Sequence, residues 1–153
     1  MTEPSESARR LWRFADLEKT GLASHPVESL SVTAVMILCA RWCGVCRGFE
    51  QACEAFMAEP AAAAVDLWLW VDVEDAADVL PSLDVETFPT LVIIQNDRLT
   101  LGGPLRPELA ALRRALDKAL RDPQPVALDQ TSQQEIVRLA AAFERRRRED
   151  AVH

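Results

Sequence analysis

SVTAVMILCARWCGVCRGF, residues 31–49, changes its hydrophobic period midway, and this change predicts the local fold. Ser31–Cys39 is almost entirely apolar and contains β-branched residues, which is typical of a strand buried on both faces of a parallel sheet. From Cys43 onward, apolar residues spaced three, four and three apart line one face of a helix that ends near Glu59-Pro60. These residues are Cys46, Phe49, Cys53 and Phe56. The stretch therefore predicts a strand that leads into a helix, with cysteines at the junction.

The segments after this junction predict further strands and helices. Val65–Val73 repeats the buried-strand pattern, and Asp75–Leu83 suggests a short helix interrupted by a proline. Leu91–Ile94 and Arg98–Leu101 flank a polar turn and predict a hairpin. After Gly102-Gly103, which we interpret as a turn, a helical stripe of leucines should pack on the sheet. The stripe consists of Leu105, Leu109, Leu112, Leu116 and Leu120.

This order divides the chain into a layered α/β domain over residues 1–121 and a helical extension over residues 122–153. Near the amino terminus, residues 5–22 fit either a helix or, at Leu11–Phe14, a short edge strand. Both alternatives stay open.

The extension has the features of a single helix. Ser132 and Glu135 form a capping-box signature near its start. An apolar stripe follows at Ile136, Leu139, Ala140 and Phe143. Because an isolated helix of this length is marginal in water, we expect the stripe to dock on the domain. The alternative is a surface for a partner or for a second copy of the chain.

The composition limits the kinds of partner. With 153 residues, 49% of them hydrophobic, the chain suits one domain with an ordinary core. A net charge of −7 argues against nucleic acid or an anionic membrane as the main partner. The amino-terminal residues lack the apolar segment of a signal peptide, and the longest apolar stretch, Ala34–Ala40, is far too short to span a bilayer. We therefore expect a cytoplasmic protein.

Residues 39–46 contain three of the four cysteines of the chain. A cluster of this kind is a metal site, a structural disulfide or a set of reactive thiols. A structural disulfide is disfavoured in a reducing cytoplasm. Structural zinc normally uses two ligand pairs, whereas this chain has one CxxC pair and two histidines, so we expect no metal. Cys43 would lie at a helix N-terminus, where free N–H groups and the helix dipole lower the pKa of a thiol. Cys46, one turn further on, is near enough to form a reversible disulfide with Cys43.

Two motifs resemble those of the thioredoxin family. Trp42-Cys43-Gly44-Val45-Cys46-Arg47 looks like the active-site motif, and Thr87-Phe88-Pro89-Thr90 lies where thioredoxins carry a cis-proline loop. The resemblance covers Ser31 to Leu120 and implies a thioredoxin-like α/β fold, with a central mixed sheet flanked by helices and here an extra C-terminal helix. It also implies that Cys43 attacks a substrate disulfide and that Cys46 resolves the mixed disulfide.

The resemblance further implies a substrate-binding surface around the thiols. Trp42 would shield the site and contact protein substrates. Pro89, in cis, would lie against the disulfide, and the backbone of Thr87 and Phe88 would pair with an extended substrate chain. Phe88 could equally be part of the core.

The chain departs from the family at two positions near the thiols. Ile37 stands where thioredoxins usually have a buried aspartate that moves the proton of the resolving thiol, so that proton would need water or another group. Val45 replaces the usual proline before the second cysteine.

The other two cysteines each have a simple interpretation. Cys53 lies about 10 Å along the helix from Cys46, which is too far for a disulfide without unwinding, so we expect it in the core. Cys39 ends the strand beside the site, where thioredoxins usually have an aromatic residue. It is either core or an accessory thiol that can form a regulatory disulfide or a glutathione adduct.

Two classes of function remain. The first is a thiol–disulfide oxidoreductase that reduces disulfides in partner proteins, is re-reduced by a separate reductase or dithiol donor, and needs no bound cofactor. The second is a thioredoxin-fold binding or chaperone-like module whose cysteine pair is a redox switch or a relic. Ile37 favours the second class, whereas the intact motifs around Cys43 and Pro89 favour the first. We therefore predict a protein-disulfide reductase.

Overall fold

The computed structural model describes residues 10–17 and 30–152, and it contains a five-stranded mixed sheet in the order β1-β3-β2-β4-β5. The strands are β1 (Leu11–Arg13), β2 (Thr33–Cys39), β3 (Leu67–Asp72), β4 (Thr90–Gln95) and β5 (Arg98–Pro104). Strands β1, β3 and β2 pair in parallel, whereas β4 pairs antiparallel with both β2 and β5. The α/β fold with a central mixed sheet is therefore confirmed.

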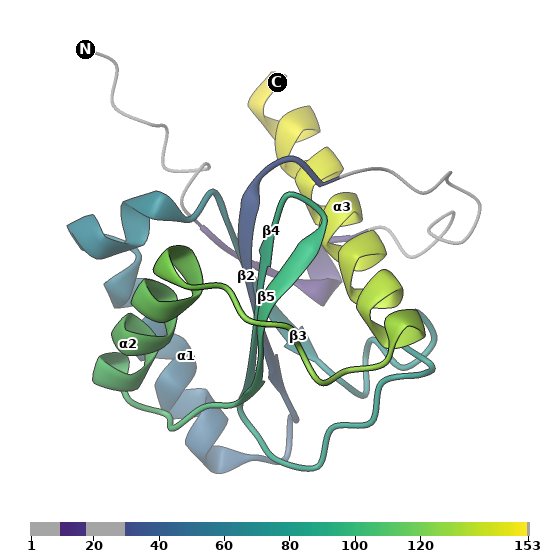
Figure 1. Cartoon of the computed structure of the whole chain (residues 1–153), viewed down its shortest axis with the longest axis horizontal. Coiled ribbons are helices and arrows are strands. Elements are labelled where there is room, and N and C mark those ends of the chain that lie inside the picture. Colours follow the sequence, from purple (N-terminus) through teal and green to yellow (C-terminus); the bar gives the residue numbers. More distant parts are fainter. Residues whose placement is uncertain (1–9, 18–29, 153) are drawn as a thin grey trace.

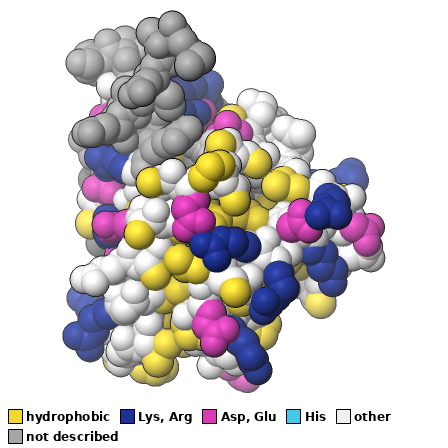
Figure 2. All heavy atoms as spheres, turned by 90° about the vertical axis from the view of Figure 1, so that its left-hand side faces the viewer, with side chains coloured by type: hydrophobic (Ala, Val, Ile, Leu, Met, Phe, Trp, Pro, Cys, Tyr) yellow, Lys and Arg dark blue, Asp and Glu magenta, His cyan; other side chains and the backbone are white. Residues whose placement is uncertain are grey.

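Helices cover both faces of this sheet (Figure 1). Helices α1 (Gly44–Phe56) and α2 (Leu109–Arg121) lie on one face, and α3 (Gln130–Val152) lies on the other. Among the described residues, two short 3-10 segments also occur. The segment η2 (Phe14–Asp16) directly follows β1, and η4 (Pro60–Ala64) lies between α1 and β3. On the side that α1 and α2 cover, exposed hydrophobic side chains lie among interspersed basic and acidic ones (Figure 2). Within the described residues, no helix is both long and apolar enough to cross a membrane.

Strand β2 lies at the centre and is buried on both faces. Val35, Ile37 and Cys39 belong to the core on the side of α1 and α2. Met36 and Leu38 belong to the core on the side of α3. Because successive side chains of a strand point to opposite faces, a strand covered on both sides needs an unbroken apolar run. This requirement explains the sequence of β2.

Strand β1 resolves one alternative of the sequence analysis. Leu11–Arg13 pairs in parallel with β3 at the edge of the sheet, and the Trp12 side chain is buried against the α3 side. Of the two interpretations of this segment, the edge strand is therefore correct at these residues. The rest of the segment, residues 5–9 and 18–22, lies outside the described residues.

Helix α3 packs on the sheet with the expected stripe. Ile136, Leu139, Ala140 and Phe143 are each at most 1% exposed and share one core with residues of β2 and β3. The expected docking of this helix is thus confirmed. The alternative role of this stripe, as a surface for a partner or a second copy, would require the helix to leave the sheet.

The predicted capping box at Ser132 and Glu135 is wrong. The helix begins at Gln130, and the Asp129 carboxylate caps it by accepting hydrogen bonds from the N–H of Ser132 (3.3 Å) and from its hydroxyl (2.5 Å). The Ser132 hydroxyl also donates to the carbonyl of Ser82 (3.1 Å), and the Glu135 carboxylate accepts from the N–H of Ser82 (3.0 Å). The capping-box residues therefore attach α3 to the segment after β3, because a tertiary contact lies within their reach.

The predicted short helix at Asp75–Leu83 is also wrong, since the segment forms successive turns. The Asp72 carboxylate accepts hydrogen bonds from the N–H groups of Glu74 (2.8 Å) and Asp75 (3.2 Å), as a helix cap does. However, the backbone bonds that follow mix two spacings, since the N–H groups of Val79 (3.0 Å) and Leu80 (2.9 Å) both donate to the carbonyl of Ala76. Pro81 disfavours the helical conformation at the residue before it.

Gly102-Gly103 is not a turn but part of β5, paired with Val92 and Leu91 of β4. A Cβ atom on Gly102 would lie 2.8 Å from Cγ1 of Val126, in the segment that connects α2 to α3. Glycine is therefore needed here because another part of the chain packs directly on the strand.

Candidate active site

The site lies where β2 gives way to α1. The N–H of Cys43 donates to the carbonyl of Ala40 (2.9 Å), which closes a turn after Cys39, the last residue of the strand. Because α1 begins at Gly44, Cys43 is the N-cap residue, and its backbone is extended (φ −86°, ψ 106°). The sequence expectation for this junction is confirmed, because Cys43 stands directly before the first helical turn.

The environment of Cys43 favours its thiolate. The nearby N–H of Cys46 and then the Cys46 thiol, with a smaller contribution from the N–H of Val45, favour the charged sulfur and hold the Cys43 pKa below its usual range. Cys43 is partly exposed, so a substrate can reach its sulfur. The site therefore combines a partly exposed thiol with surroundings that favour its anion.

Cys46 differs from Cys43 in burial and charge. Its side chain is 2% exposed, and burial is the largest of the effects that raise the pKa of its thiol. The four cysteines are all free, so the pair is in its dithiol form. The structure thus brings together one exposed sulfur that favours the anion and one buried sulfur that retains its proton.

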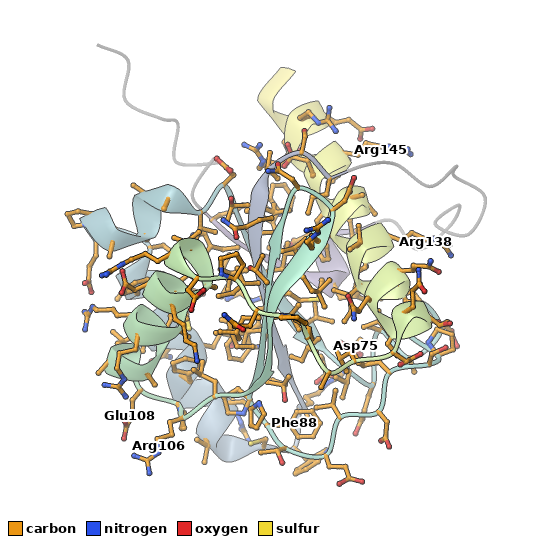
Figure 3. All side chains as sticks on the ribbon, in the orientation of Figure 1. Asp75, Phe88, Arg106, Glu108, Arg138 and Arg145 are labelled. Carbon is orange, nitrogen blue, oxygen red and sulfur yellow. The ribbon has the colours of Figure 1, made fainter. Side chains whose placement is uncertain are left out.

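Hydrophobic side chains surround the accessible sulfur. Trp42 is 67% exposed and Val45 is 57% exposed. The ring of Trp42 meets that of Phe88 edge to face, with 5.6 Å between their centroids and an interplanar angle of 87°. Phe88 lies at the end of the sheet from which α1 starts (Figure 3). Two segments far apart in the sequence therefore form one apolar surface beside Cys43.

The loop before β4 completes this surface. The peptide bond between Phe88 and Pro89 is cis, and Pro89 is buried. The Thr90 hydroxyl donates to the carbonyl of Thr87 (2.6 Å), and the N–H of Leu105 donates to the carbonyl of Pro89 (3.0 Å). These bonds hold the loop in place, while Thr87 is exposed and Phe88 is half-buried.

A cavity of about 370 Å³ lies on the other side of Cys46. Its lining includes the side chains of Cys39 and Cys46 together with residues from β1, the end of β3 and α1. The charged residues among them are Arg13, Arg41, Arg47, Glu50, Asp72 and Asp75. The sequence analysis missed this cavity because these residues come from separate segments with no common spacing.

Most charges around the cavity are paired across elements. Arg13 of β1 forms ion pairs with Glu50 (2.8 Å) and Glu54 of α1. Arg41 forms ion pairs with Asp75 and, at 4.0 Å, with Asp72 at the end of β3. These pairs join the active-site helix and loop to neighbouring strands on the side away from Phe88.

The two departures from the family have clear structural positions. Ile37 is fully buried in β2, between Trp70 of β3 and Leu91 of β4. No carboxylate therefore projects from this position toward Cys46. Val45 lies exposed in the first turn of α1, so a proline is not needed there to fill space.

Cys53 and Cys39 are both buried. Cys53 is 0% exposed, and burial raises its pKa to about 12, which confirms it as a core residue. Cys39 is 2% exposed, belongs to the same core as Cys46 and lines the same cavity. It is therefore part of the core and lies close to Cys46. Among the described residues, no group of three or more His, Cys, Asp or Glu side chains is arranged to hold a metal ion.

Comparison with known proteins agrees with this geometry. The family model named Thioredoxin matches residues 24–118, which include both the Cys43 junction and the Pro89 loop. No curated protein matches the chain.

Three solved structures illustrate the structural likeness. The chain is 19% identical to thioredoxin from Trypanosoma brucei brucei, with a TM-score of 0.56 over 79% of this chain and 100% of that one. It is 22% identical to thioredoxin from Malassezia sympodialis, with a TM-score of 0.51 over 61% of this chain and 79% of that one. Thioredoxin from Fasciola hepatica is 24% identical, with a TM-score of 0.50 over 58% of this chain and 82% of that one. At these identities the structures show a shared fold. Since the family model spans more than half of the chain, this protein belongs to the thioredoxin family, which supports a redox role for its thiols.

Proposed function

We propose that this protein is a thiol–disulfide oxidoreductase that reduces disulfides in partner proteins through Cys43 and Cys46. One observation carries the proposal: Cys43 is partly exposed at the start of α1 and packs against the core that holds the buried Cys46 in the first turn of the same helix. A nucleophile and a resolving thiol are thereby held side by side, which is the arrangement that disulfide exchange requires.

The reaction proceeds in two exchange steps. The Cys43 thiolate attacks one sulfur of a substrate disulfide, which forms a mixed disulfide and releases the other substrate sulfur as a thiolate. Cys46 then loses its proton and attacks Cys43, which releases the second substrate thiol and forms the Cys43–Cys46 disulfide. The low pKa of Cys43 assists the first step, since it makes Cys43 an anion, whereas in the second step the Cys43 sulfur is the centre attacked and the substrate sulfur is the leaving group.

The proton of Cys46 leaves through the cavity behind it. Ile37 offers no group that accepts a proton, whereas the cavity of about 370 Å³ has room for water and is lined by Glu50 and Asp72. Water in this space can pass the Cys46 proton to a carboxylate. This route would take over the task of the family's buried aspartate.

Protein substrates bind on the surface beside Cys43. Trp42 and Val45 supply exposed apolar area, and the Thr87–Phe88 backbone offers N–H and carbonyl groups that an extended substrate chain can pair with. Pro89 closes the far side of the site. The substrate class is therefore an exposed disulfide within an extended, partly apolar segment of a protein.

The cycle needs no bound cofactor. A separate reductase or dithiol donor returns the Cys43–Cys46 disulfide to the dithiol, since the chain itself supplies only the exchanging sulfurs. A reducing compartment such as the cytoplasm supports this regeneration.

Insulin reduction with dithiothreitol tests the proposal. The parent chain should accelerate reduction, and Cys43→Ser should lower the rate to that of dithiothreitol alone, because no nucleophile remains. In a separate incubation without dithiothreitol, which would cleave the adduct, reduced Cys46→Ser should accumulate a mixed disulfide with insulin, since attack persists and resolution does not. The adduct can be detected by non-reducing electrophoresis and mass spectrometry.

Cys53→Ala is the matched control, because Cys53 lies on the same helix and is buried, yet makes no contact that the mechanism uses. It should keep the parent rate. If the parent, Cys43→Ser and Cys46→Ser chains all reduce insulin at the same rate, the enzyme proposal is wrong.

A binding or chaperone-like module is the second candidate, and Ile37 favours it because the usual proton acceptor is missing. The helix expected to engage a partner, α3, buries its apolar stripe against the sheet, so such a partner would have to use the surface around Trp42. Recovery of no covalent partner with Cys46→Ser, together with binding of unfolded protein that is unaffected by Cys43→Ser, would favour this module.

A further inference from the structure

Three cysteines lie close together at the active site. Cys39 and Cys46 are buried in one core, and Cys43 packs against that core from the partly exposed side. Cys39 and Cys46 belong to the same core and line the same cavity of about 370 Å³. The resolving cysteine therefore lies near two other cysteines, a partly exposed one at Cys43 and a buried one at Cys39.

We propose that Cys39 is a third redox-active thiol, which exchanges with the Cys43–Cys46 disulfide to form a Cys39–Cys46 disulfide and thereby gives the protein an inactive, reversible oxidised state. The role of this state as an inactive form of a reductase rests on the function proposed above.

The exchange requires no further oxidant. Cys39 gives up its proton, and its sulfur attacks the sulfur of Cys46. The Cys39–Cys46 bond forms while the Cys43–Cys46 bond breaks, and the electron pair of the broken bond leaves on Cys43 as a thiolate. One disulfide replaces another, so there is no net oxidation or reduction. The proton passes to water in the cavity.

The positions of the cysteines select Cys39 for this exchange. Cys39 is at the end of β2, on the face of the sheet against which the first turn of α1 packs. Cys53 is also buried on that face but lies seven residues beyond Cys46, about 10 Å along the helix axis. A disulfide needs Cα atoms within about 7 Å, so a Cys46–Cys53 bond would require the helix to unwind.

The surroundings also favour the product of the exchange. A Cys39–Cys46 disulfide is neutral and suits the apolar interior. The charge that appears in the exchange is on Cys43, at the start of α1, where N–H groups of Val45 and Cys46 can stabilise it. Because Cys39 is buried, its thiolate is disfavoured. The neutral Cys39–Cys46 disulfide is therefore the stable oxidised form of Cys39.

The new state changes what the site can do. Cys43 still attacks a disulfide, but Cys46 is no longer a thiol and cannot resolve the adduct. The protein then holds its substrate covalently and turnover stops until a dithiol donor reduces the Cys39–Cys46 bond.

The Cys43→Ser chain tests whether Cys39 and Cys46 can pair. Four cysteines less Cys43 leave three thiols, and oxidation with diamide should reduce the thiol count to one per chain, with a peptide map that links Cys39 to Cys46. The matched double variant, Cys39→Ala with Cys43→Ser, should keep its two thiols under the same conditions. Retention of all three thiols in Cys43→Ser, or a Cys46–Cys53 link, would overturn the proposal.

The parent chain tests the exchange itself. After oxidation to the Cys43–Cys46 form with oxidised dithiothreitol, removal of the reagent and incubation for hours, acid quenching and peptide mapping should recover the Cys39–Cys46 link as well. The chain should regain free thiols at Cys39 and Cys46 when dithiothreitol is added.

Failure of this inference differs from failure of the proposed function. A parent chain that reduces insulin but yields only the Cys43–Cys46 link overturns the exchange and leaves the reductase proposal standing. A parent chain that shows the Cys39–Cys46 link but does not reduce insulin overturns the role of that link as the inactive form of a reductase.

Discussion

The packing of Phe143 predicts that α3 is an integral part of the fold. Phe143 is 0% exposed and lies in a core with residues of β2 and β3. Replacing a fully buried phenylalanine by alanine removes its burial energy and leaves a cavity, which together lower the free energy of unfolding by about 3–5 kcal/mol. Since a domain of this kind is stable by about 5–15 kcal/mol, Phe143→Ala should remove a large part of the total stability.

Urea denaturation followed by far-ultraviolet circular dichroism measures this loss. With a denaturant slope of about 2 kcal/mol per molar urea, the midpoint should fall by roughly 1.5–2.5 M. Arg138→Ala is the control, because Arg138 is on the same helix and its side chain points away from the sheet (Figure 3). Its effect on the free energy of unfolding should stay within about 0.5 kcal/mol.

The result that refutes this reasoning is a small effect of Phe143→Ala, comparable to that of Arg138→Ala. The cores on the two faces would then be independent, and α3 would be a detachable extension rather than a layer of the domain. Because Cys43 lies on the face away from α3, folded Phe143→Ala protein should retain the parent pKa of Cys43.

Three further predictions concern single contacts. The rate of Cys43 alkylation by iodoacetamide should rise with pH through a midpoint below the free-cysteine value of about 8.5, and Cys46→Ala should move that midpoint upward by removing a hydrogen-bond donor. Gly102→Ala should lower the free energy of unfolding by about 1–3 kcal/mol in urea denaturation, because the new Cβ would lie 2.8 Å from Val126, and adding Val126→Ala should recover part of the loss. Ser132→Ala should lower it by about 1 kcal/mol in the same assay, since the hydroxyl that bonds to both Ser82 and Asp129 is lost.

The local structure around the thiols follows from the sequence for a physical reason. The apolar run of β2 and the helical spacing from Cys46 to Phe56 are patterns within short segments of the chain. The structure contains the strand and the helix that these patterns predict. Cys43 is therefore at the first turn of a helix by the pattern alone. The hairpin between β4 and β5 is similar, because Asn96 and Asp97 tolerate the positive φ values of 49° and 70° that its turn requires.

Other features depend on contacts between distant segments. Ser132 and Glu135 carry a local capping signal, yet they bond to Ser82 because α3 packs beside it, and Asp129 becomes the cap. Gly102 looks like part of a turn until Val126 is seen to pack on it. In both cases a local signal permits two structures, and a contact far along the chain selects one.

The candidate site divides in the same way. The sequence by itself determined the strand–helix junction, the position of Cys43 at the helix start and the family, because these depend on spacing within short segments. Only the tertiary structure decided that Phe88 packs against Trp42, that a cavity opens behind Cys46, and that Cys39 lines this cavity together with Cys46. Those contacts join separate strands, loops and helices, and their energies depend on distance in space, which spacing along the chain does not reveal.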